Sequence, residues 1–151
     1  MRHVPPPVVL GIAAGALSVL AACALSQALE VQITSVHAAE HGGSDAELVA
    51  LRPRLRRLVG YRSFRIVHRE SRPCRWQIGE AFEIPGGRLL RVVPKTMRDQ
   101  AVVMQVKLLD GERALIDTDV RLQNRGVMLF SVDQDSRVAD GALVIMLKAE
   151  D

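Results

Sequence analysis

Aromatic residues are scarce in this chain, at 3% of its 151 residues. Lysine is scarcer still, because 17 of the 20 basic residues are arginines. A core in this protein must therefore be filled by Val, Leu, Ile, Ala and Met rather than by packed rings. The arginines also lack interleaved aromatic residues on which bases could stack, so the composition argues against nucleic acid as a partner.

Cysteine is nearly absent, since Cys23 and Cys74 are the only two. Cys23 lies in a hydrophobic N-terminal run. If that run is removed, or if Cys23 carries a lipid, Cys74 has no partner within the chain. We therefore expect no internal disulfide, and the fold must be stabilised by its core.

Catalytic signatures are missing as well. The chain has no Ser/His/Asp arrangement, no Gly-rich phosphate loop, no internal repeat and no family signature. Asp117 and Asp119 lie two residues apart on one face of an expected strand, but Arg113 and Arg121 flank them. Such a pair is more typical of cross-strand ion pairing than of acid–base catalysis. The sequence indicates no cofactor and favours a non-enzymatic protein, without excluding catalysis.

What is present begins with a targeting segment, residues 1–28. Arg2 and three prolines precede eighteen residues without a charge, from Val8 to Leu25. A core helix of that length would show a polar face, whereas the h-region of a signal peptide would not. The run is also close to the shortest that spans a bilayer.

Three interpretations of this segment remain open. A signal peptidase could cleave after Ala28 and leave Leu29 first, or a lipoprotein signal could be cleaved before Cys23, which then carries the lipid. An uncleaved membrane anchor is the third. Each places residues 29–151 outside the cytoplasm, as a periplasmic or secreted domain or as a membrane-anchored lipoprotein. We expect membrane contact only through this segment or a lipid on Cys23.

Residues 29–151 are predicted to be mainly β: a single β-sandwich or barrel-like domain of about eight strands, with one amphipathic helical segment after the first strand. Short alternating runs recur about every ten residues, and turn signals such as Pro85-Gly86-Gly87 separate them. The last run, 142–149, is apolar on both faces and is therefore expected to be a central strand. The expected strands are 29–37, 61–70, 74–84, 87–93, 100–109, 112–122, 127–132 and 142–149.

The helical segment is expected between Ser44 and Val59. Ser44 and Glu47 have the spacing of a capping box. Four leucines at helical spacing predict the buried face, Pro53 should kink or divide the helix, and Gly60 should end it. These leucines are Leu48, Leu51, Leu55 and Leu58.

One motif suggests a metal. His37, Glu40 and His41 fit the H-x-x-E-H pattern of zinc peptidases, which needs both histidines on one helical face. Here the motif straddles the end of a strand and runs into two glycines, so a loop with surface histidines is favoured. Cys74 falls on the same side of its strand as Trp76, which favours a structural thiol over a reactive one.

Charge is segregated along the chain. Residues 52–75 contain nine arginines and one acid, Glu70, for a net charge of +8, and residues 99–151 carry a net charge of −4. A surface of six arginines is expected from the helix and the following strand, and it could bind an anionic partner or be neutralised by the acidic C-terminal strands. These arginines are Arg52, Arg54, Arg56, Arg57, Arg65 and Arg69.

The sequence therefore favours an exported binding or assembly module of a bacterial envelope. Its partner would be an anionic envelope component or an acidic protein. The alternative function is a small envelope metal-binding hydrolase that uses the loop of His37, Glu40 and His41.

Overall fold

The computed structural model describes residues 3, 28–132 and 141–151. The predicted targeting segment, with Cys23, lies outside the described residues except for His3 and Ala28. No helix in the described part of the chain is long and apolar enough to cross a membrane.

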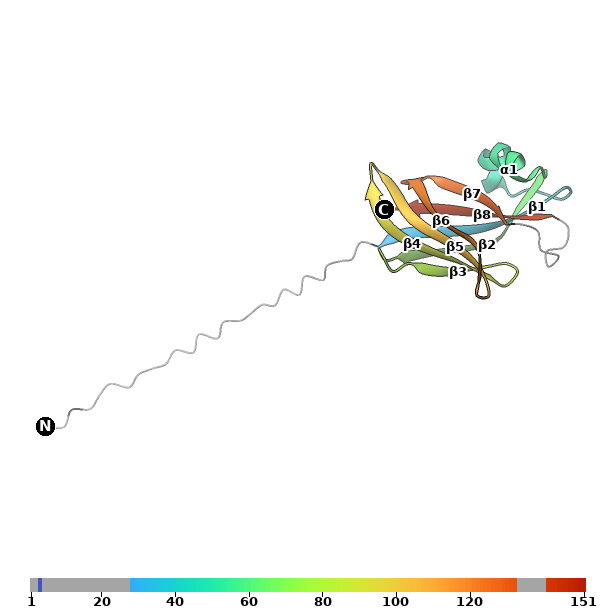
Figure 1. Cartoon of the computed structure of the whole chain (residues 1–151). Coiled ribbons are helices and arrows are strands. Elements are labelled where there is room, and N and C mark those ends of the chain that lie inside the picture. The colour runs from blue at the N-terminus through green and yellow to red at the C-terminus, as the bar shows by residue number, and fades with distance from the viewer. Residues whose placement is uncertain (1–2, 4–27, 133–140) are drawn as a thin grey trace.

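Eight strands form two antiparallel sheets, as predicted (Figure 1). The first sheet has the order β2-β1-β8-β7 and the second has the order β3-β4-β5-β6. The strands are β1 (Leu29–Ala39), β2 (Ser63–Cys74), β3 (Glu80–Ile84), β4 (Arg88–Arg98), β5 (Ala101–Asp110), β6 (Arg113–Gln123), β7 (Val127–Val132) and β8 (Ala142–Glu150).

The two sheets enclose the main core, to which both contribute buried aliphatic side chains. Leu29, Val31 and Ile33 of β1 alternate into it, and Met104 and Leu108 of β5 meet them from the opposite sheet. The strands follow one another around this core in sequence order, and β8 pairs with β1 to close the ring. Hydrogen-bonded pairing is interrupted between β2 and β3 and between β6 and β7, so the fold is a sandwich with the strand order of a barrel.

Strand β8 confirms the prediction that the run apolar on both faces is central, since it lies between β1 and β7. Leu143, Ile145 and Leu147 pack in the main core. Val144 faces the other way and is fully buried, in a second core on the outer side of the same sheet. That second core exists because a helical segment covers this end of the sheet.

The helical segment consists of a 3-10 helix, η1 (Ala46–Leu51), and an α-helix, α1 (Arg52–Val59). Pro53 lies in the first turn of α1, where a proline ring is tolerated, so the predicted division of the helix is confirmed. Gly60 ends α1 in the left-handed conformation at φ 75°, and its N–H donates to the carbonyl of Arg56. Leu48 and Leu55 are buried against the sheet.

Two details of that prediction are wrong. Ser44 and Glu47 form no capping box, because Asp45 is the N-cap of η1 and no side chain caps it. Leu58 is 40% exposed, whereas Val59 packs against the second core. Leu55 and Val59, at i and i+4, mark the buried face of α1, so Leu58 lies at the edge of that face and is left largely exposed.

The prediction of one continuous strand over 74–84 is also wrong, because its middle is a turn. Strand β2 ends at Cys74, and residues 75–79 form a turn in which Gln77 and Gly79 have positive φ angles of 70° and 78°. Cys74 and Phe82 are buried on the two sides of this turn, while Ile78 is 58% exposed. The turn carries the chain from one sheet to the other, which a single strand cannot do.

The start of β1 and the end of β8 lie at the same end of the sandwich, because Glu30 pairs with Glu150. Helix α1 lies at the opposite end of the sandwich (Figure 1), and its Leu55 is buried in the second core with Ala38 and Ala142, which pair at this end of β1 and β8. At about 3.3 Å per residue, the two ends of β1 are roughly 30 Å apart. Whatever precedes Leu29 therefore joins the domain far from α1.

Candidate functional site

Helix α1 carries four of the six predicted site arginines on its exposed surface, namely Arg52, Arg54, Arg56 and Arg57. Within the described residues, no carboxylate lies at ion-pair distance from any of them. In the described part of the acidic C-terminal half, Asp117 and Asp119 pair with Lys107 and Lys95 instead. We call these four residues the α1 arginines.

Two of the α1 arginines border a cleft of about 400 Å³ between the helix and β7. Arg54 and Arg57 are neighbours on the helix surface, at i and i+3. A guanidinium nitrogen of Arg54 donates to the carbonyl of Val127 at 3.1 Å, which holds this side chain toward β7. Leu58 and Leu129 complete the lining of the cleft.

Arg65 and Arg69, the other two predicted site residues, lie on β2 and already have partners. Arg69 forms an ion pair with Glu47 of η1 at 2.6 Å. The Nε of Arg65 donates to the carbonyl of Gly43 at 3.2 Å. These contacts tie β2 to the segment before the helix, so the six predicted residues do not act as one equivalent group.

The segment before η1 also covers the edge of β2. The backbone N–H of Phe64 donates to the hydroxyl of Ser44 at 3.0 Å, and that of Ile66 donates to a carboxylate oxygen of Asp45 at 2.6 Å. Ser44 and Asp45 thus satisfy edge donors that would otherwise face solvent. This explains why neither side chain caps the helix.

Farther along β2, Arg72 closes the seam between the sheets. It pairs with Glu70 on its own strand and with Glu80 on β3, at 2.8 and 3.3 Å, and it donates to the carbonyl of Ala81. Its guanidinium also lies 4.6 Å from the centroid of the Phe82 ring. One side chain therefore replaces part of the backbone pairing that is missing between β2 and β3.

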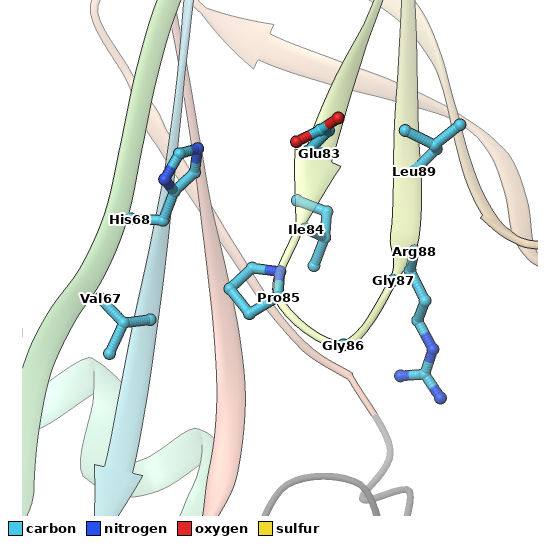
Figure 2. A pocket seen from close by; sticks show the side chains of 9 residues that line it. All are labelled: Val67, His68, Glu83, Ile84, Pro85, Gly86, Gly87, Arg88 and Leu89. Carbon is cyan, nitrogen blue, oxygen red and sulfur yellow. The ribbon is translucent and has the colours of Figure 1, made fainter.

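The same seam opens into a larger groove, of about 510 Å³, at the turn between β3 and β4. Figure 2 shows Val67 and His68 on one side and Ile84, Pro85 and Leu89 on the other. A register shift in β2 at Val67 moves His68 away from the face of Phe64 and Ile66. His68 is therefore an edge residue, 3.8 Å from Glu70.

The residues of the alternative metal site are not brought together. His37 is in β1, opposite Leu143 of β8, while Glu40 and His41 are exposed in the bend that follows. Glu40 lies 3.7 Å from Arg62. In residues 28–132 and 141–151, no three His, Cys, Asp or Glu side chains are grouped so that they could hold a metal ion.

Cys74 is fully buried at the end of β2. Burial, with a smaller contribution from Glu80, raises the pKa of its thiol from an ordinary value of 9.0 to about 12. A thiol that keeps its proton and is out of contact with solvent is a poor nucleophile. The interpretation of Cys74 as a structural residue agrees with this position.

Comparison with known proteins finds no matching family model, no matching curated protein and no matching solved structure. The candidate site therefore rests on the geometry of the chain itself. Sequence reasoning placed the α1 arginines together but missed the cleft beside them. Its apolar lining comes from Leu58, which the helical period assigned to the core, and from Leu129, about seventy positions farther along the chain. Only the tertiary structure joins the two.

Proposed function

We propose that residues 29–151 form an exported module of a bacterial envelope that binds an anionic partner through the α1 arginines. The observation that supports this most directly is the contrast in pairing. Arg62, Arg69 and Arg72 each have a carboxylate within 4.0 Å, whereas no α1 arginine has one among the described residues.

Two of the α1 arginines are unfavourably placed on the helix. Arg52 and Arg54 are in the first turn, where the helix dipole disfavours positive charge, and no acid is present in that turn. Arg56 and Arg57 are in the last turn, where the dipole favours positive charge. The spacings Arg52–Arg56 and Arg54–Arg57 place like charges side by side. An external anion would reduce this repulsion and the unfavourable dipole interaction of the first turn.

The proposed location follows from the hydrophobic run in residues 1–28, and its three interpretations lead to the same compartment. A reporter that is active only outside the cytoplasm, fused after Asp151, should be active. Mass spectrometry of the processed chain should then find either Leu29 or a lipidated Cys23 at the N-terminus. A silent reporter in cells that accumulate the fusion would refute export.

The binding function is tested on the chain in the form that cells export. Immobilised inorganic polyphosphate and polyglutamate serve as probes for phosphate and carboxylate partners. Binding should weaken as salt rises, and the double variant Arg54→Glu, Arg57→Glu should lose it with its thermal unfolding unchanged. A matched control, Arg91→Glu with Arg98→Glu, makes the same change in net charge elsewhere on the surface and should retain binding.

Two results would overturn the proposal. If the α1 reversal unfolds the domain, the arginines stabilise the fold instead. If it leaves both folding and polyanion binding unchanged, the surface has no anionic partner. The metal-binding hydrolase has no supporting observation in the geometry, because His37, Glu40 and His41 are spread over a strand and a bend.

A further inference from the structure

We infer that the cleft between α1 and β7 binds the phosphate and the adjoining acyl chain of an anionic phospholipid. This inference rests on the proposed function, because it names the kind of anion that the α1 arginines take. It goes beyond that function by giving the ligand an apolar part as well as a charge.

The charged side of the cleft suits a phosphate. Arg54 and Arg57 border it from adjacent positions on the helix, and their guanidinium groups can each present two N–H donors to phosphate oxygens. Arg54 is already held toward β7 through its contact with the carbonyl of Val127. Part of the ordering that a ligand would otherwise impose on this side chain is therefore present beforehand.

The apolar side of the cleft distinguishes it from a simple anion site. Leu58 follows Arg54 by four residues, so the two share a helix face, and its side chain is 40% exposed. Leu129 is half-buried on the facing strand. Two leucines beside two arginines that have no carboxylate partner among the described residues form an amphipathic surface, of the kind that peripheral proteins place at the boundary between headgroups and acyl chains.

An acidic protein segment matches this cleft less well. The carboxylates of such a segment would pair with the arginines, but covering the two leucines would require apolar side chains in addition. A phospholipid supplies both parts in the required order, a phosphate followed within a few bonds by methylene groups. The cleft is open to solvent and is lined by Arg54, Arg57, Leu58 and Leu129, so it contacts a phosphate and the adjoining part of a chain rather than a whole lipid.

The position of the cleft adds a consequence. It lies at the opposite end of the first sheet from Leu29, so this contact is separate from any attachment through residues 1–28. A chain held at both places would lie with the outer face of that sheet along the membrane. This differs from the expectation that the membrane is contacted only through the N-terminal segment or a lipid on Cys23.

Calorimetry with short-chain phosphatidylglycerol below its micelle concentration tests the inference on the exported chain. This probe reports the cleft without vesicle insertion of a lipidated N-terminus. Glycerol 3-phosphate tests binding of the phosphate without acyl chains. Short-chain phosphatidylcholine tests binding of a phosphate whose charge is neutralised by an adjoining cation. We expect phosphatidylglycerol to bind at least about tenfold more tightly than glycerol 3-phosphate, because only the former buries methylene groups.

Substitutions separate the two parts of the site. Arg54→Gln with Arg57→Gln should abolish binding of both anions. Leu58→Ser should weaken phosphatidylglycerol about three- to tenfold and leave glycerol 3-phosphate unchanged. Val49→Ser is the matched control, since Val49 is 60% exposed on η1 and does not line the cleft.

Equal affinity for the two anions, with no effect of Leu58→Ser, would overturn the phospholipid inference and leave the anion site in place. The same holds if phosphatidylglycerol fails to bind while arginine-dependent binding to polyphosphate or polyglutamate persists. If none of these anions binds in a way that depends on Arg54 and Arg57, the proposed function itself would be overturned.

Discussion

Helix α1 and strand β2 each carry a row of arginines, and the two rows are used differently. On β2, Arg69 and Arg72 pair with carboxylates from other elements, and Arg65 holds the loop before the helix. On α1, no arginine reaches a carboxylate among the residues that the structure describes. A high density of arginines in a sequence therefore does not define a binding surface. The arginines of β2 are engaged in contacts that hold parts of the fold together.

The largest expected effect comes from a substitution in the buried face of the helix that carries the α1 arginines. Leu55 is fully buried beneath α1, so Leu55→Asp should lower the free energy of unfolding by about 3 kcal/mol or more. The matched control is Leu58→Asp on the same helix, which should change it by less than about 0.5 kcal/mol because that site is half-exposed. Urea unfolding measures both. Similar effects at the two sites would mean that the buried face of α1 is misassigned.

A smaller change in stability should distinguish the arginines of β2 from the α1 arginines. Arg72→Ala removes the contacts to Glu80, to the carbonyl of Ala81 and to the Phe82 ring. We expect a loss of about 1 to 3 kcal/mol. Arg52→Ala should be neutral within about 0.5 kcal/mol, since Arg52 is exposed and unpaired among the described residues. If Arg52→Ala destabilised the domain as much as Arg72→Ala, the distinction between the rows would fail.

The smallest expected effect is the pH dependence of stability that Cys74, at the end of β2, produces. Folded Cys74 keeps its proton to about pH 12, whereas an unfolded thiol releases it from about pH 9. Unfolding between these values therefore releases a proton, so stability should fall as pH rises, by roughly 1 kcal/mol in total between pH 8 and pH 10. Comparison with Cys74→Ala at pH 8 and pH 10 cancels the titration of other groups. An identical pH dependence in the two proteins would show that Cys74 is not buried as described.

Much of the fold could be predicted because alternation along a strand depends only on which face is buried. The runs of β5 and β8 are examples, since Val102, Met104 and Leu143 have the burial that their positions predict. What failed depended on backbone geometry that the side-chain pattern does not encode. Leu55 and Val59 mark the buried face of α1 and leave Leu58 at its edge, and the positive φ angles of Gln77 and Gly79 broke the strand expected over 74–84.

The candidate site was predictable only in part, for a related reason. Consecutive residues of one helix must lie near one another, so the α1 arginines were placed correctly. Whether an arginine has a partner depends on distant residues, and Glu47, which pairs with Arg69, lies 22 positions away. Leu129 and Ser44 acquired their roles through contacts that no local spacing predicts.

The most direct test of the account compares two double substitutions that remove the same charge. Arg54→Gln with Arg57→Gln affects the helical row, and Arg65→Gln with Arg69→Gln affects the strand row. The measurement is the salt concentration at which each variant elutes from immobilised polyphosphate. We expect a large drop for the helical pair and elution near that of the unaltered chain for the strand pair. An equal drop for both pairs would contradict the proposed role of α1, because binding would then follow net charge and not the arginines that lack a carboxylate partner among the described residues.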